Sequence, residues 1–268
     1  MRINFLYSFI ILLLVSVTSC QKVIELDLNE SEPLIVIEGV VNKDSLVHTI
    51  YISQSKKFSS NNVFTKVEDA IVTLSDDLNN VEILIMDSPG VYKSSTILGQ
   101  EGRTYTLKVQ LGEEIFTSTS VMPSQVEFLD ILFIPDEFTG GGSKIAIPSR
   151  LDPIGVSNSY KFDVSVSRFK DNKGWIRDSA IIIQNDEFSD GLYSQQPIFG
   201  TLGSFMPKDT CRITMMNIDG NVYKYFYSLS LNTGGAATPA NPISNISNGA
   251  LGYFSAQTIQ TLEVVVPE

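Results

Sequence analysis

Alternation of apolar and polar residues is the main pattern along the chain, and it predicts β-strands. KVIELDLN at 22–29 alternates, PLIVIEGVVN at 33–42 is a longer apolar run, and HTIYISQS at 48–55 alternates again. Strand-like runs at 68–77 and 80–87 meet at the residues DLNN, which favour a turn. The first half of the chain is therefore expected to consist of strands and turns.

A hairpin turn at Gly112 completes about seven or eight expected strands before Pro123. Evenly spaced short strands are typical of an immunoglobulin-like β-sandwich, so we predict one over residues 20–123. The Cys-Trp-Cys pattern of true immunoglobulin domains is missing from the sequence. The prediction therefore concerns the architecture alone.

Residues 124–150 are expected to lead into a second, β-rich domain over 124–268. TGGGSK at 139–144 predicts a loop, and two alternating runs flank DNKG at 171–174, a strong hairpin signal. The stretch 221–232 fits a helix by its i, i+3, i+4, i+7 apolar residues, and a strand by its alternating tyrosines. Periodicity leaves both alternatives open there.

The N-terminus carries a different pattern, one apolar run that follows one positive charge. Arg2 precedes FLYSFIILLLV at 5–15, and small or polar residues follow. These features predict a secretory signal peptide over residues 1–19. The run is too short for a membrane-spanning helix, which needs about 20 apolar residues.

Cys20 lies where the signal peptide is expected to be cleaved. VTSC at 17–20 resembles a bacterial lipobox, which implies a diacylglycerol on the thiol and an acylated new amino terminus. Cys20 is therefore the predicted lipid-attachment residue, with an ordinary signal peptide and a chance cysteine as the alternative. Because position 21 is Gln rather than Asp, a retention signal of the enterobacterial inner membrane is absent, and we expect the outer membrane, on either face.

Composition limits the partners of the chain. The 43% hydrophobic and 18% charged residues are typical of a folded globular protein. Acidic residues outnumber basic ones 30 to 19, for a formal charge of -11. Phosphate contacts need clustered Lys and Arg, and none appear beyond Lys56 and Lys57, so nucleic-acid binding is disfavoured.

The sequence offers few residues for catalysis, and we predict no enzyme, no catalytic residue and no cofactor. His48 is the only histidine, which excludes a histidine-cluster metal site, and we expect it to be exposed or at a sheet edge. The adjacent acids Asp136 and Glu137, and likewise Asp186 and Glu187, are interpreted as solvated turn charges rather than a catalytic pair.

Two oxygen-rich stretches are typical of calcium loops and of β-turns alike. They are NDEFSDG at 185–191 and SDDLNN at 75–80, and neither matches the twelve-residue calcium loop. We therefore predict no metal site and leave calcium binding by these turn carboxylates open. Cys211 has apolar neighbours, and we expect it to be a small buried residue.

Several blocks together resemble a known family. SCQKVIELDL at 19–28, EPLIVIEGVVN, AIVTLSDD, GRTYTLKV and above all NPISNISNGALGYFSA at 241–256 are similar to the Bacteroidota lipoproteins grouped as domain of unknown function 4249. The resemblance implies an immunoglobulin-like N-terminal sandwich and a β-rich C-terminal part with one short helix, which favours a helix at 221–232. Where family members tend to read VEGW, this chain has IEGV at 37–40, and its one tryptophan is Trp175.

The same resemblance implies a function without supplying catalytic residues. Genes of this family often lie beside those of TonB-dependent receptors. We therefore expect a lipid-anchored accessory or ligand-binding lipoprotein of the outer membrane that works with such a receptor in nutrient uptake. A structural or adhesion lipoprotein of the cell surface is the alternative.

Overall fold

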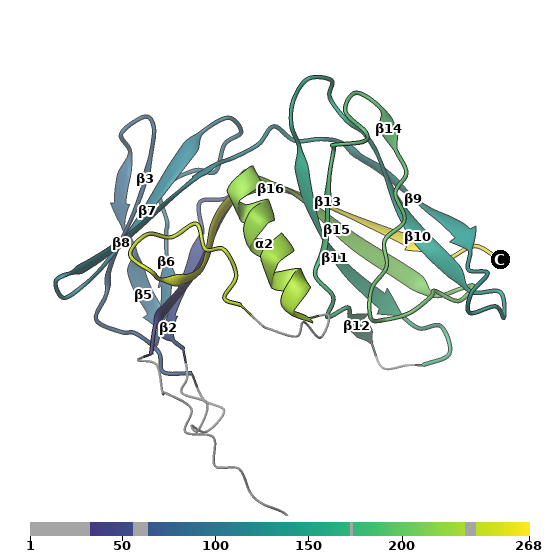
Figure 1. The fold of residues 1–268 in the computed structure, drawn as a ribbon, viewed down its shortest axis with the longest axis horizontal. Coiled ribbons are helices and arrows are strands. Elements are labelled where there is room, and N and C mark those ends of the chain that lie inside the picture. The colour runs from purple at the N-terminus through teal and green to yellow at the C-terminus, as the bar shows by residue number, and fades with distance from the viewer. Residues whose placement is uncertain (1–32, 56–63, 172–173, 234–239) are drawn as a thin grey trace, which may run out of the picture. The chain divides into compact units, whose positions relative to one another are not determined.

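Strand β16 (Leu251–Val265) connects the two halves of one nine-stranded sheet. Residues 251–257 of this strand pair in parallel with β1 (Ile35–Asn42). Residues 258–265 pair antiparallel with β15 (Thr210–Ile218). Figure 1 shows this strand, at the yellow end of the colour scale, between the elements of both halves.

The structure is a computed structural model, and it describes residues 33–55, 64–171, 174–233 and 240–268. All of these belong to the compact unit Pro33–Glu268. The predicted signal peptide, Cys20 and the strand expected at 22–29 lie outside the described residues, so they stay predictions. Within the described ranges, no helix has both the length and the apolar character needed to cross a membrane.

The large sheet has the strand order β12-β11-β15-β16-β1-β2-β6-β5, and β13 also pairs with β11. Each pairing except β1 with β16 is antiparallel. Its remaining strands are β2 (Thr49–Gln54), β5 (Ile85–Ser88), β6 (Val91–Lys93), β11 (Ser159–Ser167), β12 (Trp175–Arg177) and β13 (Ile182–Asn185).

A four-stranded sheet shares a core with the β1 half of the large sheet. Residues that alternate along β7 point inward and are buried, as expected for a strand with one apolar face. Ile37, Leu74, Leu107 and Phe254 meet in this core. The sheet has the order β4-β3-β7-β8, with β3 (Ile71–Asp76), β4 (Val81–Ile83), β7 (Thr104–Leu111) and β8 (Glu114–Val121).

The β11 and β15 half of the large sheet has its own core. Phe162, Val164 and Ile213 pack there with Ile131 and Ala146 of a three-stranded sheet. Cys211 is fully buried among them as a free thiol, as its apolar neighbours predict. The three-stranded sheet has the order β14-β10-β9, with β9 (Phe128–Pro135), β10 (Lys144–Leu151) and β14 (Tyr193–Ser194).

Helix α2 (Gly220–Thr233) settles the ambiguous stretch in favour of a helix. Asp219 caps its first turn, because Oδ1 accepts hydrogen bonds from the backbone N–H groups of Asn221 and Val222 at 2.8 and 3.0 Å. The face with Val222, Tyr225 and Phe226 is buried against β15 and β16. The helical spacing of apolar residues, rather than the alternating tyrosines, therefore describes this segment.

The predicted fold class, mainly β with one short helix, is confirmed. Eight strands precede Pro123 in the part of the chain that the structure describes, the turn at 77–80 joins β3 to β4, and Gly112 turns the β7–β8 hairpin. Strands β11 and β12 pair around 171–174 as predicted, and 139–144 leads as a loop into β10. A domain boundary at 123 stays a prediction, and β16 adds a strand from beyond that boundary to the sheet of β1.

Candidate functional site

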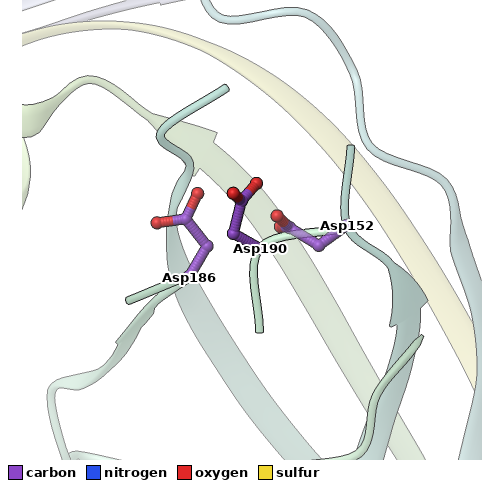
Figure 2. Close-up of side chains that lie close together, drawn as sticks. All are labelled: Asp152, Asp186 and Asp190. Carbon is purple, nitrogen blue, oxygen red and sulfur yellow. The ribbon is translucent and has the colours of Figure 1, made fainter. Parts of the chain in front are cut away.

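Three carboxylates from two loops converge beside the ends of β10, β13 and β14. Asp152 follows β10, Asp186 follows β13, and Asp190 lies just before β14. One carboxylate oxygen from each lies within 4.8 Å of the others. Figure 2 shows the three side chains next to one another, with Asp190 between the other two. We refer to these three residues as the aspartate cluster.

The local turn geometry brings the loops together. The N–H of Ser189 donates to the carbonyl of Asp186 at 2.7 Å, and that of Leu192 donates to the carbonyl of Ser189 at 2.9 Å, so 186–192 forms consecutive turns. Gly191 has φ +69, and a Cβ there would lie 2.9 Å from Cβ of Ile154 in the other loop. Glycine therefore allows both the turn and the close approach of the loops.

Each carboxylate of the cluster is oriented by one hydrogen bond to one of its two oxygens. The hydroxyl of Tyr160 donates to Asp152 Oδ1. The backbone N–H of Asn158 donates to Asp186 Oδ2 at 2.5 Å, and that of Gly155 donates to Asp190 Oδ1 at 2.7 Å. The β10–β11 loop thus holds the acids of the β13–β14 loop. The second oxygen of each carboxylate accepts no hydrogen bond from the described residues.

Because two of its three carboxylates are buried, the aspartate cluster is costly to ionise without a positive charge nearby. Asp152 is 1% exposed and Asp186 6%, whereas Asp190 is exposed. Burial raises the pKa of Asp152, and the charges of Asp186 and Asp190 raise it further, while the hydrogen bond from Tyr160 and the charge of Arg150 lower it. Like charges and a low-polarity setting therefore disfavour the ionised cluster.

Arg150 supplies part of the positive charge near the cluster. It is fully buried, and its guanidinium carbon lies 4.0 Å from the centre of the Tyr160 ring. Nη1 donates to Gln184 Oε1 at 3.0 Å, while Nε and Nη2 have no hydrogen-bond partner among the described residues. Burial lowers the pKa of Arg150, and the charges of Asp152 and Asp186 oppose that shift.

A polar hollow lies elsewhere, between β8, the start of α2 and the loop before β16. Its volume is about 430 Å³. The loop wall is held in place because Ser247 exchanges hydrogen bonds with Thr117, and Asn245 donates to the carbonyl of Phe254 and accepts from its N–H. Its lining residues are Thr117, Ser118, Thr119, Asn221, Lys224, Ile243, Ser244, Asn245, Ile246 and Ser247.

The structure corrects the expectation for His48. This side chain is 1% exposed, just before β2, and neither exposed nor solvated. Its Nε2 lies 2.9 Å from the carbonyl oxygen of Ile97, while Nδ1 is buried without a partner. Burial lowers the pKa of His48. A strand-like run does not by itself show which of its side chains are buried, so the sequence could not place this imidazole.

The structure corrects the interpretation of both acidic pairs as solvated turn charges, because the aspartate of each pair, Asp136 and Asp186, is buried. Asp136 lies in a turn as predicted but is only 8% exposed, because it accepts hydrogen bonds from Thr139 and Ser204. These hydroxyls lower the pKa of Asp136 to about 2. Glu137 is exposed and lies outside the aspartate cluster, as does Glu187.

The acids of residues 75–80 already have a counter-charge, which Arg103 supplies. Arg103 forms an ion pair with Asp76 at 2.9 Å and also pairs with Asp77. Asp76 further accepts hydrogen bonds from the N–H groups of Leu78 and Asn80. This is the arrangement of a hydrogen-bonded turn, and the guanidinium of Arg103 neutralises the carboxylates that would otherwise attract a cation.

A comparison with models of protein families shows which family the chain belongs to. The model described as Domain of unknown function (DUF4249) matches residues 21–263. The chain belongs to this family. The predicted resemblance is thereby confirmed at the level of the family, and the match includes all three residues of the aspartate cluster. Among curated proteins, none matches the chain.

Sequence reasoning found two of the three residues of the aspartate cluster. The stretch 185–191 was recognised as rich in oxygen ligands, and it supplies Asp186 and Asp190. Asp152, Tyr160 and Arg150 were missed, because their approach depends on how two loops meet. The one local signal is the Asp-Pro pair that ends the strand-like KIAIPSRL.

Proposed function

We propose that this protein is a lipid-anchored accessory or ligand-binding lipoprotein of the outer membrane that works with a TonB-dependent receptor in nutrient uptake. The observation that carries the proposal is the leader, in which an apolar run and the small residues before Cys20 match a lipobox. Acyl chains contribute about 0.8 kcal/mol per buried CH₂, so several of them would anchor a folded body stably.

The polar hollow is the feature that fits a ligand-binding role. Serine, threonine and asparagine side chains and the amino group of Lys224 surround a volume of about 430 Å³. Such groups would orient a small polar ligand by hydrogen bonds. Its wall at 243–247 belongs to the block on which the resemblance to the family most depends.

Co-purification tests the partnership with a receptor. The full chain, tagged at its C-terminus, is isolated from mildly solubilised outer membranes and from membranes of a Cys20→Ala strain. The proposal predicts that a TonB-dependent receptor accompanies the unmodified protein and is depleted with the variant. Repeated recovery of the lipoprotein alone would contradict the partnership, and ladders of self-associated chains would instead favour the structural or adhesion role.

A further inference from the structure

We propose that Asp152, Asp186 and Asp190 bind one Ca²⁺ ion, which joins the β10–β11 loop to the β13–β14 loop. The ligand atoms are one oxygen from each carboxylate, and these oxygens lie within 4.8 Å of one another. Two oxygens on the same calcium ion, at 2.3 to 2.6 Å from it, can be up to about 5 Å apart. The cluster therefore has the dimensions of a shared calcium shell.

The hydrogen bonds prepare the carboxylates for this role. Tyr160, Asn158 and Gly155 each donate to one oxygen of one aspartate. Each side chain is thereby oriented while its other oxygen stays free to coordinate. Such supporting contacts are what fixes ligands around a metal in proteins generally.

A buried atom without a partner points to a ligand independently of the clustering. Oδ2 of Asp152 is inaccessible to solvent and has no hydrogen-bond partner among the described residues. A buried carboxylate oxygen in this condition is strongly disfavoured, because it has lost water and gained nothing in exchange. A cation between the carboxylates would supply the missing interaction.

The charges of the site also match a divalent ion. The charge of Arg150 acts on Asp152. Three carboxylates and one guanidinium leave two negative charges, which one divalent cation would neutralise. Binding would remove the repulsion between the two loops and hold them together.

The ligand chemistry selects calcium among divalent ions. The cluster offers oxygen atoms, whereas zinc and copper sites are built with histidine and cysteine. Magnesium binds oxygen at about 2.0 to 2.1 Å, needs near-ideal octahedral geometry and usually keeps several waters, so it is seldom held by a dedicated set of protein carboxylates. Calcium accepts carboxylate oxygens in a more flexible geometry, and this favours it for the aspartate cluster.

Calcium titration of the full chain tests this proposal. The protein is purified in detergent and stripped with a chelator. One sample is then titrated by calorimetry with calcium chloride and a second sample with magnesium chloride, each up to about 5 mM, which is above typical dissociation constants of weak calcium sites. We expect one calcium per chain and a rise in melting temperature that magnesium does not reproduce. No binding heat and no thermal shift, or an equal response to magnesium, would overturn the assignment.

Matched variants show whether the response belongs to this site. Asp190→Asn keeps the acceptor for Gly155, and because Asp190 is exposed, the variant should fold. It should weaken calcium binding by at least about 10-fold. Glu187→Gln removes the same charge from an exposed position in the same turn and should leave binding unchanged. Equal losses in both variants would contradict a specific site. None of these results depends on the lipid anchor.

Discussion

The hydroxyl of Tyr160 donates a hydrogen bond to Oδ1 of Asp152, and both side chains are buried. The ring of the same tyrosine lies under the guanidinium of Arg150. Tyr160 therefore connects the buried cation to the aspartate cluster. This contact links strand β11 to the loop that follows β10, so it contributes to the position of that loop as well as to the orientation of the carboxylate.

Tyr160→Phe tests this contact, because it keeps the ring and removes only the hydroxyl. Asp152 would then be buried with neither oxygen hydrogen-bonded, and we expect a loss of about 1 to 3 kcal/mol in the free energy of unfolding by urea. Tyr227→Phe is the control, since Tyr227 is 51% exposed, and it should change stability by less than about 0.5 kcal/mol. Similar losses in both variants would show that the buried hydrogen bond is unimportant.

Gly252→Ala tests the parallel pairing of β1 with β16. Gly252 has φ +95, and a Cβ there would lie 2.0 Å from the carbonyl oxygen of Ile37. Strain and collision with backbone together should cost about 3 kcal/mol or more in unfolding free energy. Gly249→Ala is the matched control, with φ +72 but open space around the added methyl, and should cost about 1 kcal/mol. Equal costs would contradict the close approach.

His48 makes stability depend on pH in a predictable direction. Burial lowers its pKa below the ordinary value of 6.5, so below pH 6.5 the unfolded chain takes up a proton that the folded chain resists. This contribution to stability is present above pH 6.5 and is lost as the pH falls through the folded-state pKa. The backbone carbonyl of Ile97 and the charge of Glu82 oppose the shift without reversing it.

His48→Gln removes that titration. Unfolding free energies are measured for both proteins between about pH 7 and pH 5, above the usual range of carboxylates. The difference in stability between the unmodified protein and the variant should shrink as the pH falls. A difference that is constant over this range would mean that His48 titrates alike in both states.

Asn245→Ala tests the attachment of the loop that lines the polar hollow. The variant loses both hydrogen bonds between Asn245 and Phe254, at 2.7 and 2.9 Å. We expect faster hydrogen exchange at the amide of Phe254 and a loss of about 1 to 2 kcal/mol. Asn241→Ala, on the exposed start of the same segment, should leave that exchange unchanged. Equal exchange at the amide of Phe254 in both variants would mean that other contacts hold this loop in place.

Local patterns predict local structure in this chain, and they fail where distant segments meet. The alternating burial along β7 and β11 follows the alternation in sequence. The same pattern could not reveal that the two halves of β16 pair with β1 and with β15, because strand partners are not local information. The helix at 220–233 was ambiguous because its tyrosines also alternate, and packing against β15 and β16 decides it.

The candidate site shows the same limit. Turn chemistry identified 185–191 as rich in oxygen ligands, since Asp and Gly have recognisable preferences there. Asp152 lies 33 positions before the start of that turn, and it and the side chains that support it meet the turn only in the fold. The expectation for His48 was wrong because a strand-like run does not show which of its side chains are buried, and this one is 1% exposed.

The mass of the N-terminal peptide of the protein purified from its native membranes tests the central proposal most directly. A peptide that begins at Cys20 and carries a diacylglyceryl group and an amide-linked acyl chain is the predicted result. Cys20→Ala should abolish the lipid, whereas Cys211→Ala should keep it, because Cys211 is buried in the fold. A mature chain that begins elsewhere, or that begins at Cys20 without lipid, would contradict the account.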